Sequence, residues 1–327
     1  RYLLPLYSIF ISVPVGLIKN AVVARAMWTT FQVVLLVLSG ILVLNWIRWK
    51  RSWLFTIFLI VLLLISVPAV RSLSSGSMTI VSFALIIASM ALILRRQDQA
   101  GGLLLAFSLI HPDLVYTIVL FLLLWAGFQK RSQIIWWFLA TFALLMGFSI
   151  LILPSWPQDY LQSLIQYSAN NPIPQAGAPA NAINVRLLIA KNVLLITLLI
   201  YEWLVVNTVG NKRLIWNLAL LLGISPWIGS TIFLETTILI LPAFLTGLGL
   251  LVKLWKDRVK ILIILLPILL FVLSWVFSGD TIAGISPQWS TFGLTGLIPA
   301  IVVVILYWSR WWVIRTEKFD EEGIFAA

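Results

Sequence analysis

Residues 74–113 read SSGSMTIVSFALIIASMALILRRQDQAGGLLLAFSLIHPD, and this stretch decides the fold. It holds an apolar span (77–94), a charged turn, and a second apolar run (100–110) that ends at His111-Pro112-Asp113. A helix needs about 20 residues to cross a bilayer core, so the second run can go only part of the way. Pro112 lacks an N–H donor and disfavours helical geometry at His111, which predicts a helix break. Irregular backbone at membrane depth is tolerated only inside protein or beside a water-filled cavity, so this break is the first candidate for a site.

The composition places the whole chain in a membrane. Hydrophobic residues make up 61% of the 327 residues and charged residues 10%, and the mean hydropathy is +1.07. These values exclude a soluble domain of this length and predict an all-α, polytopic membrane bundle. The net charge of +11 does not indicate nucleic-acid binding, because the basic residues fall in short clusters between apolar runs.

The apolar runs predict one transmembrane domain over residues 1–327, with about ten spans or half-spans. Residues 1–18 are broken by prolines and predict an interfacial or re-entrant helix. The expected full spans are 21–46, 53–69, 77–94, 134–153, 185–206, 261–277 and 292–308. The loop 154–184 is polar and begins with a short amphipathic helix, and residues 309–327 form a tail of mixed charge.

Two hairpins in this topology are broken by proline. The first joins 100–110 to 114–127 at His111-Pro112-Asp113, and the second joins 214–224 to 228–252 at Ser225-Pro226-Trp227. Basic residues flank both hairpins at both ends, so both breaks face the exterior. This topology puts all Lys and Arg residues on the cytoplasmic side except Arg1, Lys19, Arg25, Arg71, Arg186 and Lys191.

The charges that topology does not explain are the candidates for chemistry. Asp113 and His111 can serve as a proton acceptor and as a phosphate or sugar ligand; the alternatives are a helix cap for Asp113 and a polar packing residue for His111. Cations near the headgroups, Arg71, Arg186 and Lys191, can bind the phosphate of an anionic lipid or simply extend to ordinary headgroups.

Three acidic residues complete the set of candidates. Glu235 lies inside a span and faces either the bundle interior or an aqueous pocket, since both keep it away from lipid. Asp159 is interpreted as a loop or cap residue, and Glu202, toward the cytoplasmic end of its span, as structural.

Several kinds of site are excluded by what the sequence lacks. The chain has no cysteine and one histidine, which excludes disulfides, thiolate catalysis and a His-rich zinc site. It also has no Walker loop, no Gly-x-Gly-x-x-Gly and no Asp-x-Asp, so a nucleotide and a bridging metal have no support. We therefore expect no cofactor and no metal, and any transferase activity would use a donor carried on a lipid.

The run from Val67 to Asp113 resembles the core of glycosyltransferase family 87, the polyprenyl-phosphate-mannose-dependent mannosyltransferases of the GT-C superfamily. Members show a Pro before a Gly-Gln that opens a span, a basic turn, an Ala-Gly-rich short helix and a Lys-Pro break. The matching residues here are Pro68, Gly76, Arg95, Arg96, Ala100, Gly101 and Pro112. Ser77 stands in the usual place of Gln, and His111 in that of Lys. Residues 2–28 and 224–242 look similar to two further family segments, although the second has a longer spacing and lacks a His after its Trp.

The resemblance implies a GT-C fold in the cell membrane, a hexose donor on polyprenyl phosphate, and an active site facing the exterior of the cell envelope. The hexose would be mannose, and the acceptor a lipid or glycan. Substrate-binding positions would be Arg71, Ser77, His111, Arg186, Lys191 and Glu235, with Asp113 at the reacting hydroxyl. In this superfamily the catalytic acid usually lies in the first exterior loop, so we expect it upstream of residue 1.

Two other readings stay open at this point. A lipid or small-solute transporter or flippase would use proline-broken hairpins at membrane depth as its binding site. However, both hairpins have the same in-out-in sense, and no acidic coupling pair lies at mid-span. The third reading is a catalytically inactive family member, since His replaces Lys and the usual acid is not seen.

Overall fold

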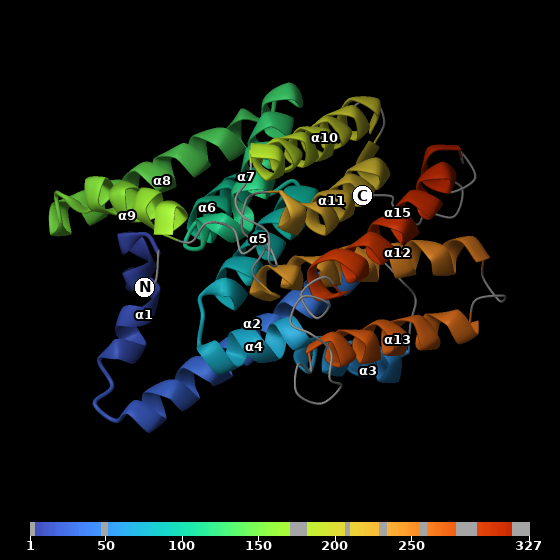
Figure 1. Cartoon of the computed structure of the whole chain (residues 1–327), viewed down its shortest axis with the longest axis horizontal. Helices are drawn as coiled ribbons and strands as arrows, with labels where there is room; N and C mark the ends of the chain where they lie inside the picture. The colour runs from blue at the N-terminus through green and yellow to red at the C-terminus, as the bar shows by residue number, and fades with distance from the viewer. Residues whose placement is uncertain are drawn as a thin grey trace. The chain divides into compact units, whose positions relative to one another are not determined.

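The computed structural model describes residues 4–46, 52–170, 182–206, 210–228, 234–255, 260–278 and 293–315. These residues are almost entirely helical and contain no strand, so the all-α prediction is confirmed (Figure 1). The α-helices are α1 (Ile9–Gly16), α2 (Ala21–Trp46), α3 (Trp53–Leu64), α4 (Val67–Ser75), α5 (Thr79–Leu94), α6 (Asp98–Ser108), α7 (Pro112–Phe128), α8 (Ser132–Ile152), α9 (Trp156–Asn170), α10 (Ala182–Val206), α11 (Gly210–Ile224), α12 (Ile240–Trp255), α13 (Lys260–Ser278) and α15 (Ile298–Arg315). Short 3-10 or π turns are η1 (Leu6–Ser8), η2 (Ser225–Trp227), η3 (Leu234–Leu239) and η5 (Gly293–Leu297).

Three described helices are long and apolar enough to cross a membrane: Ala21–Trp46, Ser132–Ile152 and Gly293–Arg310. A fourth candidate is the pair α3 and α4, which is bent by 55°. Shorter apolar helices, including α5 and α7, accompany them. This pattern is compatible with a multi-pass membrane protein.

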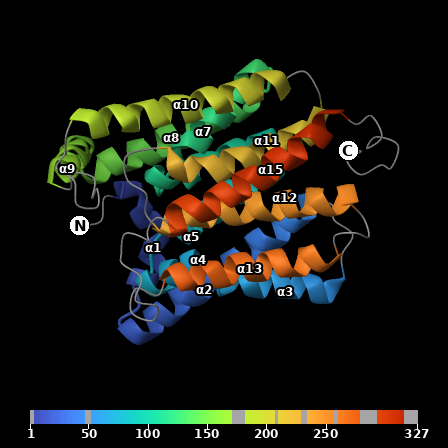
Figure 2. The ribbon, with the colours of Figure 1, turned by 45° about the vertical axis from the view of Figure 1, so that its right-hand side comes forward.

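The chain divides into two compact units. Unit 1 comprises Arg1–Leu35 and Ser75–Ile189, and unit 2 comprises Leu36–Ser74 and Ala190–Ala327. In unit 1, α6 packs against both α5 and α8, and α7 contacts α5 and α8. In unit 2, α11, α12 and α15 pack against one another, and α13 runs beside α3, as Figure 2 shows.

The helices of unit 1 are joined by two turns of the same design. Arg96 and Lys130 each adopt a left-handed conformation just after a helix, with φ of 62° and 55°. In each turn the next N–H donates back to the helix, from Gln97 to the carbonyl of Leu92 and from Arg131 to that of Ala126. This is the Schellman pattern, which satisfies the last carbonyls of a helix. The two turns therefore reverse the chain without exposing unpaired backbone.

Arg131 ties the ends of four helices in unit 1. Its guanidinium donates to both carboxylate oxygens of Asp98 and, at 2.7 Å, to the carbonyl of Ile93. It also lies over the ring of Trp125, 5.1 Å from the centroid. The pair joins the start of α6 to the start of α8, and its bidentate geometry holds the turns in register.

Gly102 allows α6 and α8 to approach closely, because a Cβ at this position would lie 2.4 Å from the carbonyl oxygen of Ile134. We expect Gly102→Ala to destabilise the protein by about 1–3 kcal/mol, since the obstacle is backbone that cannot rotate away. The measurement is the free energy of unfolding in detergent. Gly147→Ala on α8 is the matched control, because nothing lies within 4 Å of its Cβ position. Equal stability of the two variants would contradict the close approach.

A buried ion pair joins α10 to α15 in unit 2. Arg310 Nε donates to Glu202 Oε2 at 2.8 Å, and the Tyr307 hydroxyl lies 3.4 Å from Oε1. Glu202 is only 3% exposed. Trp216 packs edge-on against Tyr307 and donates its indole N–H to the carbonyl of Leu306 at 2.9 Å. These contacts support the interpretation of Glu202 as structural.

The expected span 53–69 is wrong as a single straight helix, because the structure ends α3 at Leu64 and begins α4 at Val67. Had the helix continued, the ring of Pro68 would have met the carbonyl of Leu64. Side-chain donors satisfy the carbonyls at the bend. Ser66 Oγ donates to the carbonyl of Leu63 at 2.7 Å, and Trp275 Nε1 donates to that of Ile65 at 3.0 Å. The break is therefore built into the packing of unit 2.

The second expected hairpin is confirmed at its break, and the described part of its second half begins with a 3-10 turn before the α-helix. Helix α11 ends at Ile224 and is followed by the turn η2, as Ser225-Pro226-Trp227 predicted. Ile228 itself is not helical, and residues 229–233 lie outside the described part. Residues 234–239 form the 3-10 turn η3, and α12 begins at Ile240. Pro242 then stands at the third position of α12, where its missing N–H costs no hydrogen bond.

The predicted cytoplasmic tail begins inside a helix, since α15 continues through residue 309 to Arg315. Its remaining residues, 316–327, lie outside the described part, as do the basic cluster Arg48, Lys50 and Arg51 and nearly all of the exterior loop 278–291. The loop 154–184 contains α9, so the predicted amphipathic helix is confirmed; residues 171–181 are outside the described part.

Candidate functional site

The helix break at residues 108–113 is present where Pro112 predicted it. Helix α6 ends at Ser108, and α7 begins at Pro112 with His111 at its N-cap position. Pro112 is tolerated there because the first N–H groups of a helix have no partner within it. Asp113 follows in the first turn of α7, where a negative charge is favourable. His111 is half-buried and Asp113 is exposed.

Side chains from other elements satisfy the carbonyls that the break opens. The Tyr7 hydroxyl donates to the carbonyl of Leu109 at 2.9 Å, and the Ser82 hydroxyl donates to that of Ser108. An unsatisfied carbonyl in an apolar surrounding costs about 1–3 kcal/mol, so these two donors stabilise the non-helical backbone. The break is therefore a fixed feature of unit 1.

Apolar and aromatic side chains surround the break. A buried cluster, named here the break cluster, consists of Tyr7, Met78, Val81, Ile110, Leu145 and Trp156. The Tyr7 ring packs edge-on against Trp156 at 6.2 Å between centroids, and Trp156 lies 5.8 Å from Tyr160. Because Trp156 and Tyr160 are on α9, this helix is held against the break by aromatic contacts.

The turn before α5 belongs to the same end of unit 1. Trp28 donates its indole N–H to the carbonyl of Gly76 at 3.0 Å, and Gln32 donates to that of Ser77 at 2.6 Å. The Ser77 hydroxyl lies 3.0 Å from that of Thr79. The N-terminal half of α2 thus positions the start of α5. Met78, which lies in this turn, packs in the break cluster.

The carboxylate of Asp113 acts on the phenol of Tyr160. Burial, and then the charge of Asp113, raises the pKa of Tyr160 to about 12. Burial also raises the pKa of Tyr7 above its ordinary range. Both phenols are hydrogen-bond donors at neutral pH, Tyr7 toward the carbonyl of Leu109 and Tyr160 within reach of the charge of Asp113. Aromatic faces, hydroxyl donors and one carboxylate are the groups that recognise a sugar's C–H face and its hydroxyls.

We expect Asp113→Asn to lower the pKa of Tyr160, because it removes the negative charge that disfavours the phenolate. The measurement is the phenolate absorbance of full-length protein in detergent between pH 10 and about 12, taken as the difference from the same protein carrying Tyr160→Phe. An unchanged pKa would show that the two side chains are not neighbours.

The raised pKa of Tyr160 also makes the stability of the folded protein depend on pH. Between pH 10 and about 12 the folded state keeps the Tyr160 proton that the unfolded state loses, so stability falls as pH rises through this window. Tyr160→Phe should remove part of that fall, which thermal unfolding at several pH values would detect.

The two units divide the predicted site residues between them. Ser77, His111 and Asp113 lie in unit 1 and are brought to the break end just described. Arg71 (α4), Lys191 (α10) and Glu235 (η3) lie in unit 2, and each is half-buried. Arg186 is on α10 in unit 1, with a side chain outside the described part.

Three residues of this site were missed as site residues by the sequence reasoning: Tyr7, Trp156 and Tyr160. Each is an aromatic residue within three positions of a proline in an otherwise apolar chain, namely Pro5 for Tyr7 and Pro157 for Trp156 and Tyr160. Aromatic residues beside a proline at the edge of a span are a usable signal for such positions. Within the described residues, no three His, Asp or Glu side chains gather as a metal site would require.

No protein-family model, curated protein or solved structure matches this chain. The resemblance to glycosyltransferase family 87 therefore stays a prediction from short motifs.

Proposed function

We propose that this chain is a membrane glycosyltransferase that moves a hexose, mannose in the first instance, from a polyprenyl-phosphate donor to a lipid or glycan acceptor. The proposal is carried by the break at His111, where the charge of the exposed Asp113 raises the pKa of Tyr160, whose ring lies 5.8 Å from that of Trp156. A carboxylate and aromatic faces suit an acceptor sugar, and the apolar helices suit a donor that stays in the bilayer.

The reaction would be a single displacement with inversion. A carboxylate takes the proton of the acceptor hydroxyl, the oxygen of this hydroxyl forms a bond to the sugar's anomeric carbon, and the bond from that carbon to the phosphate oxygen breaks. Polyprenyl phosphate leaves with the bonding electrons. Asp113 contacts the acceptor or accepts its proton, while Arg71, His111 and Arg186 hold the phosphate charge. Ser77, Lys191 and Glu235 complete the proposed substrate contacts, on the exterior side of the plasma membrane.

The test is the transfer of labelled mannose by membranes that contain the full-length protein. We expect transfer from polyprenyl-phosphate-mannose and none from a nucleotide-linked mannose, because no phosphate-cradling loop is present in the sequence. Transfer from the nucleotide sugar alone, or movement of the intact lipid across the bilayer without transfer, would contradict the proposal. The second outcome would favour the transporter reading.

A further inference from the structure

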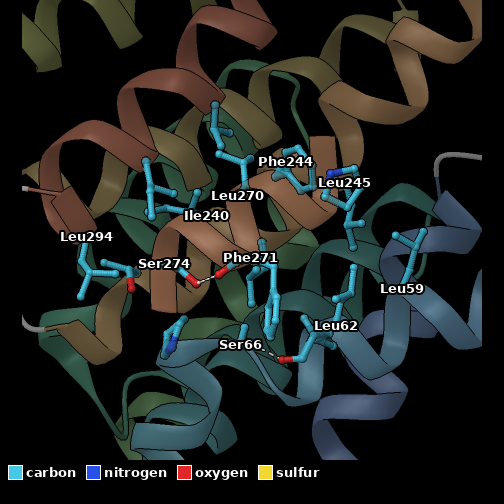
Figure 3. A pocket seen from close by; sticks show the side chains of 17 residues that line it. Leu59, Leu62, Ser66, Ile240, Phe244, Leu245, Leu270, Phe271, Ser274 and Leu294 are labelled. Carbon is cyan, nitrogen blue, oxygen red and sulfur yellow. Dashed lines mark hydrogen bonds between the residues drawn. The ribbon is translucent and has the colours of Figure 1, made fainter. Parts of the chain in front are cut away.

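Unit 2 holds an apolar pocket that none of the proposed catalytic or binding residues lines. It encloses about 760 Å³ of empty space, part of it open to the surroundings. Side chains from α3, α12 and α13 point into it, among them Leu59, Phe244, Leu245, Leu270 and Ser274 (Figure 3).

Helix breaks explain why the space is there. Ser66 and Pro68, at the bend between α3 and α4, line one part of the pocket, and Pro267, inside α13, lines another. Prolines kink helices away from their neighbours. At the far end of α13 the packing is instead tight, because a Cβ on Gly293 would lie 2.2 Å from the ring of Phe277.

The lining is almost entirely apolar, and its polar side chains are Ser66, Thr237 and Ser274. Its two serine hydroxyls donate within their own segments, Ser66 to the carbonyl of Leu63 and Ser274 to that of Phe271, each at 2.7 Å. No charged side chain lines the pocket. A water molecule needs two to four polar partners, so water does not fill this space well. The chemistry fits a hydrocarbon chain.

The outer faces of α3 and α13 indicate where such a hydrocarbon chain would come from. The helices α3 and α13 lie side by side, and both carry exposed apolar residues on their outer faces, including Trp53 and Leu54 on α3 and Leu265 and Leu269 on α13. In a membrane bundle such faces are in contact with lipid tails. The pocket lies directly behind them. The hydrocarbon that contacts these outer faces in a bilayer is the acyl chain of phospholipid, and the lining holds no cation that would select a particular headgroup.

We propose that this pocket is a lipid-chain site that takes one acyl chain of a bilayer phospholipid and holds it between α3, α12 and α13. The site rests on the membrane character of unit 2 and not on the glycosyltransferase proposal. Burying several methylene groups of one chain corresponds to a retention of at least about tenfold over a lipid held only at the outer surface.

The test is native mass spectrometry of the full-length protein, extracted in mild detergent and washed. We expect one retained phospholipid for the wild-type chain. Two variants fill the pocket: Leu270→Trp, at a lining position that is 8% exposed, and Ser274→Leu, which replaces a hydroxyl that donates within α13. Both should lower the retained fraction by about tenfold or more.

Leu269→Trp is the matched control, since the same substitution is made one residue away at a position that is 59% exposed. It should retain phospholipid as the wild type does. Elution as a single sharp species confirms that a variant is folded, and Ser274→Leu decides the matter where Leu270→Trp does not fold. Equal retention by the pocket-filling variants, retention of a polyprenyl phosphate instead, or no retained lipid on the wild type would overturn the proposal. The glycosyltransferase assay is independent of all three results.

Discussion

Replacing Asp113 by Asn should lower kcat/KM for mannose transfer by about 100-fold or more. The substitution keeps the size and the hydrogen-bonding reach of the side chain but removes its capacity to accept a proton and to hold a developing positive charge, effects that contribute about 10²–10⁴-fold. The cost to folding is small, because Asp113 is exposed in the first turn of α7 and its interaction with the helix dipole is worth about 0.3–1 kcal/mol.

Asp159→Asn is the control for this variant. Asp159 is also exposed and lies on α9 next to Tyr160, but its carboxylate accepts a hydrogen bond from Ser155 Oγ at 2.8 Å, in the manner of a local cap. Transfer should stay within about threefold of the wild type, a change of under 1 kcal/mol, as for most substitutions away from a site. If both variants lost activity equally, or if Asp113→Asn kept it, the role assigned to Asp113 would be wrong.

The second large effect concerns stability. We expect Arg310→Met to destabilise the protein by about 3–5 kcal/mol, because it leaves the carboxylate of Glu202 buried without its cation. The measurement is reversible unfolding in mixed micelles, followed by the fluorescence of the tryptophans. Arg95→Met, at an exposed position, removes the same charge and should change stability by less than about 1 kcal/mol.

A double variant separates the ion pair from the packing of α15. Glu202→Gln combined with Arg310→Met removes both charges, and most of the lost stability should return. A double variant as unstable as the sum of its two single variants would show that the two side chains act independently.

Local chemistry made part of the fold predictable from the sequence. The breaks at His111 and at Ser225 were placed correctly because proline acts within one turn of itself. The start of α2 at Ala21 was predicted to the residue because the polar residues Lys19 and Asn20 precede the apolar run. The bend after Leu64 carries the same signal in Pro68. It was missed because the apolar run continues across it, and uniform hydropathy hides a break that a short turn accommodates.

Long-range pairings could not be predicted in this way. Arg131 pairs with Asp98 across 33 positions and Arg310 with Glu202 across 108, and nothing local distinguishes these two cations from the other basic residues of the sequence. The same holds for Tyr7, whose role at the break depends on the carbonyl of Leu109, 102 residues away. The meeting of Arg71 and His111 in one site stays a prediction, since the two residues belong to different units.

The most direct test of the central claim is to find where the donor binds. A polyprenyl-phosphate-mannose analogue with a photoreactive group near its phosphate is added to membranes of the full-length protein, and the labelled residues are located by peptide mass spectrometry. Our account predicts labels at residues 108–113 and on α4 near Arg71, both competed by unlabelled donor. Competed labels confined to the turn at Arg95 and Arg96, on the predicted cytoplasmic side, would contradict it.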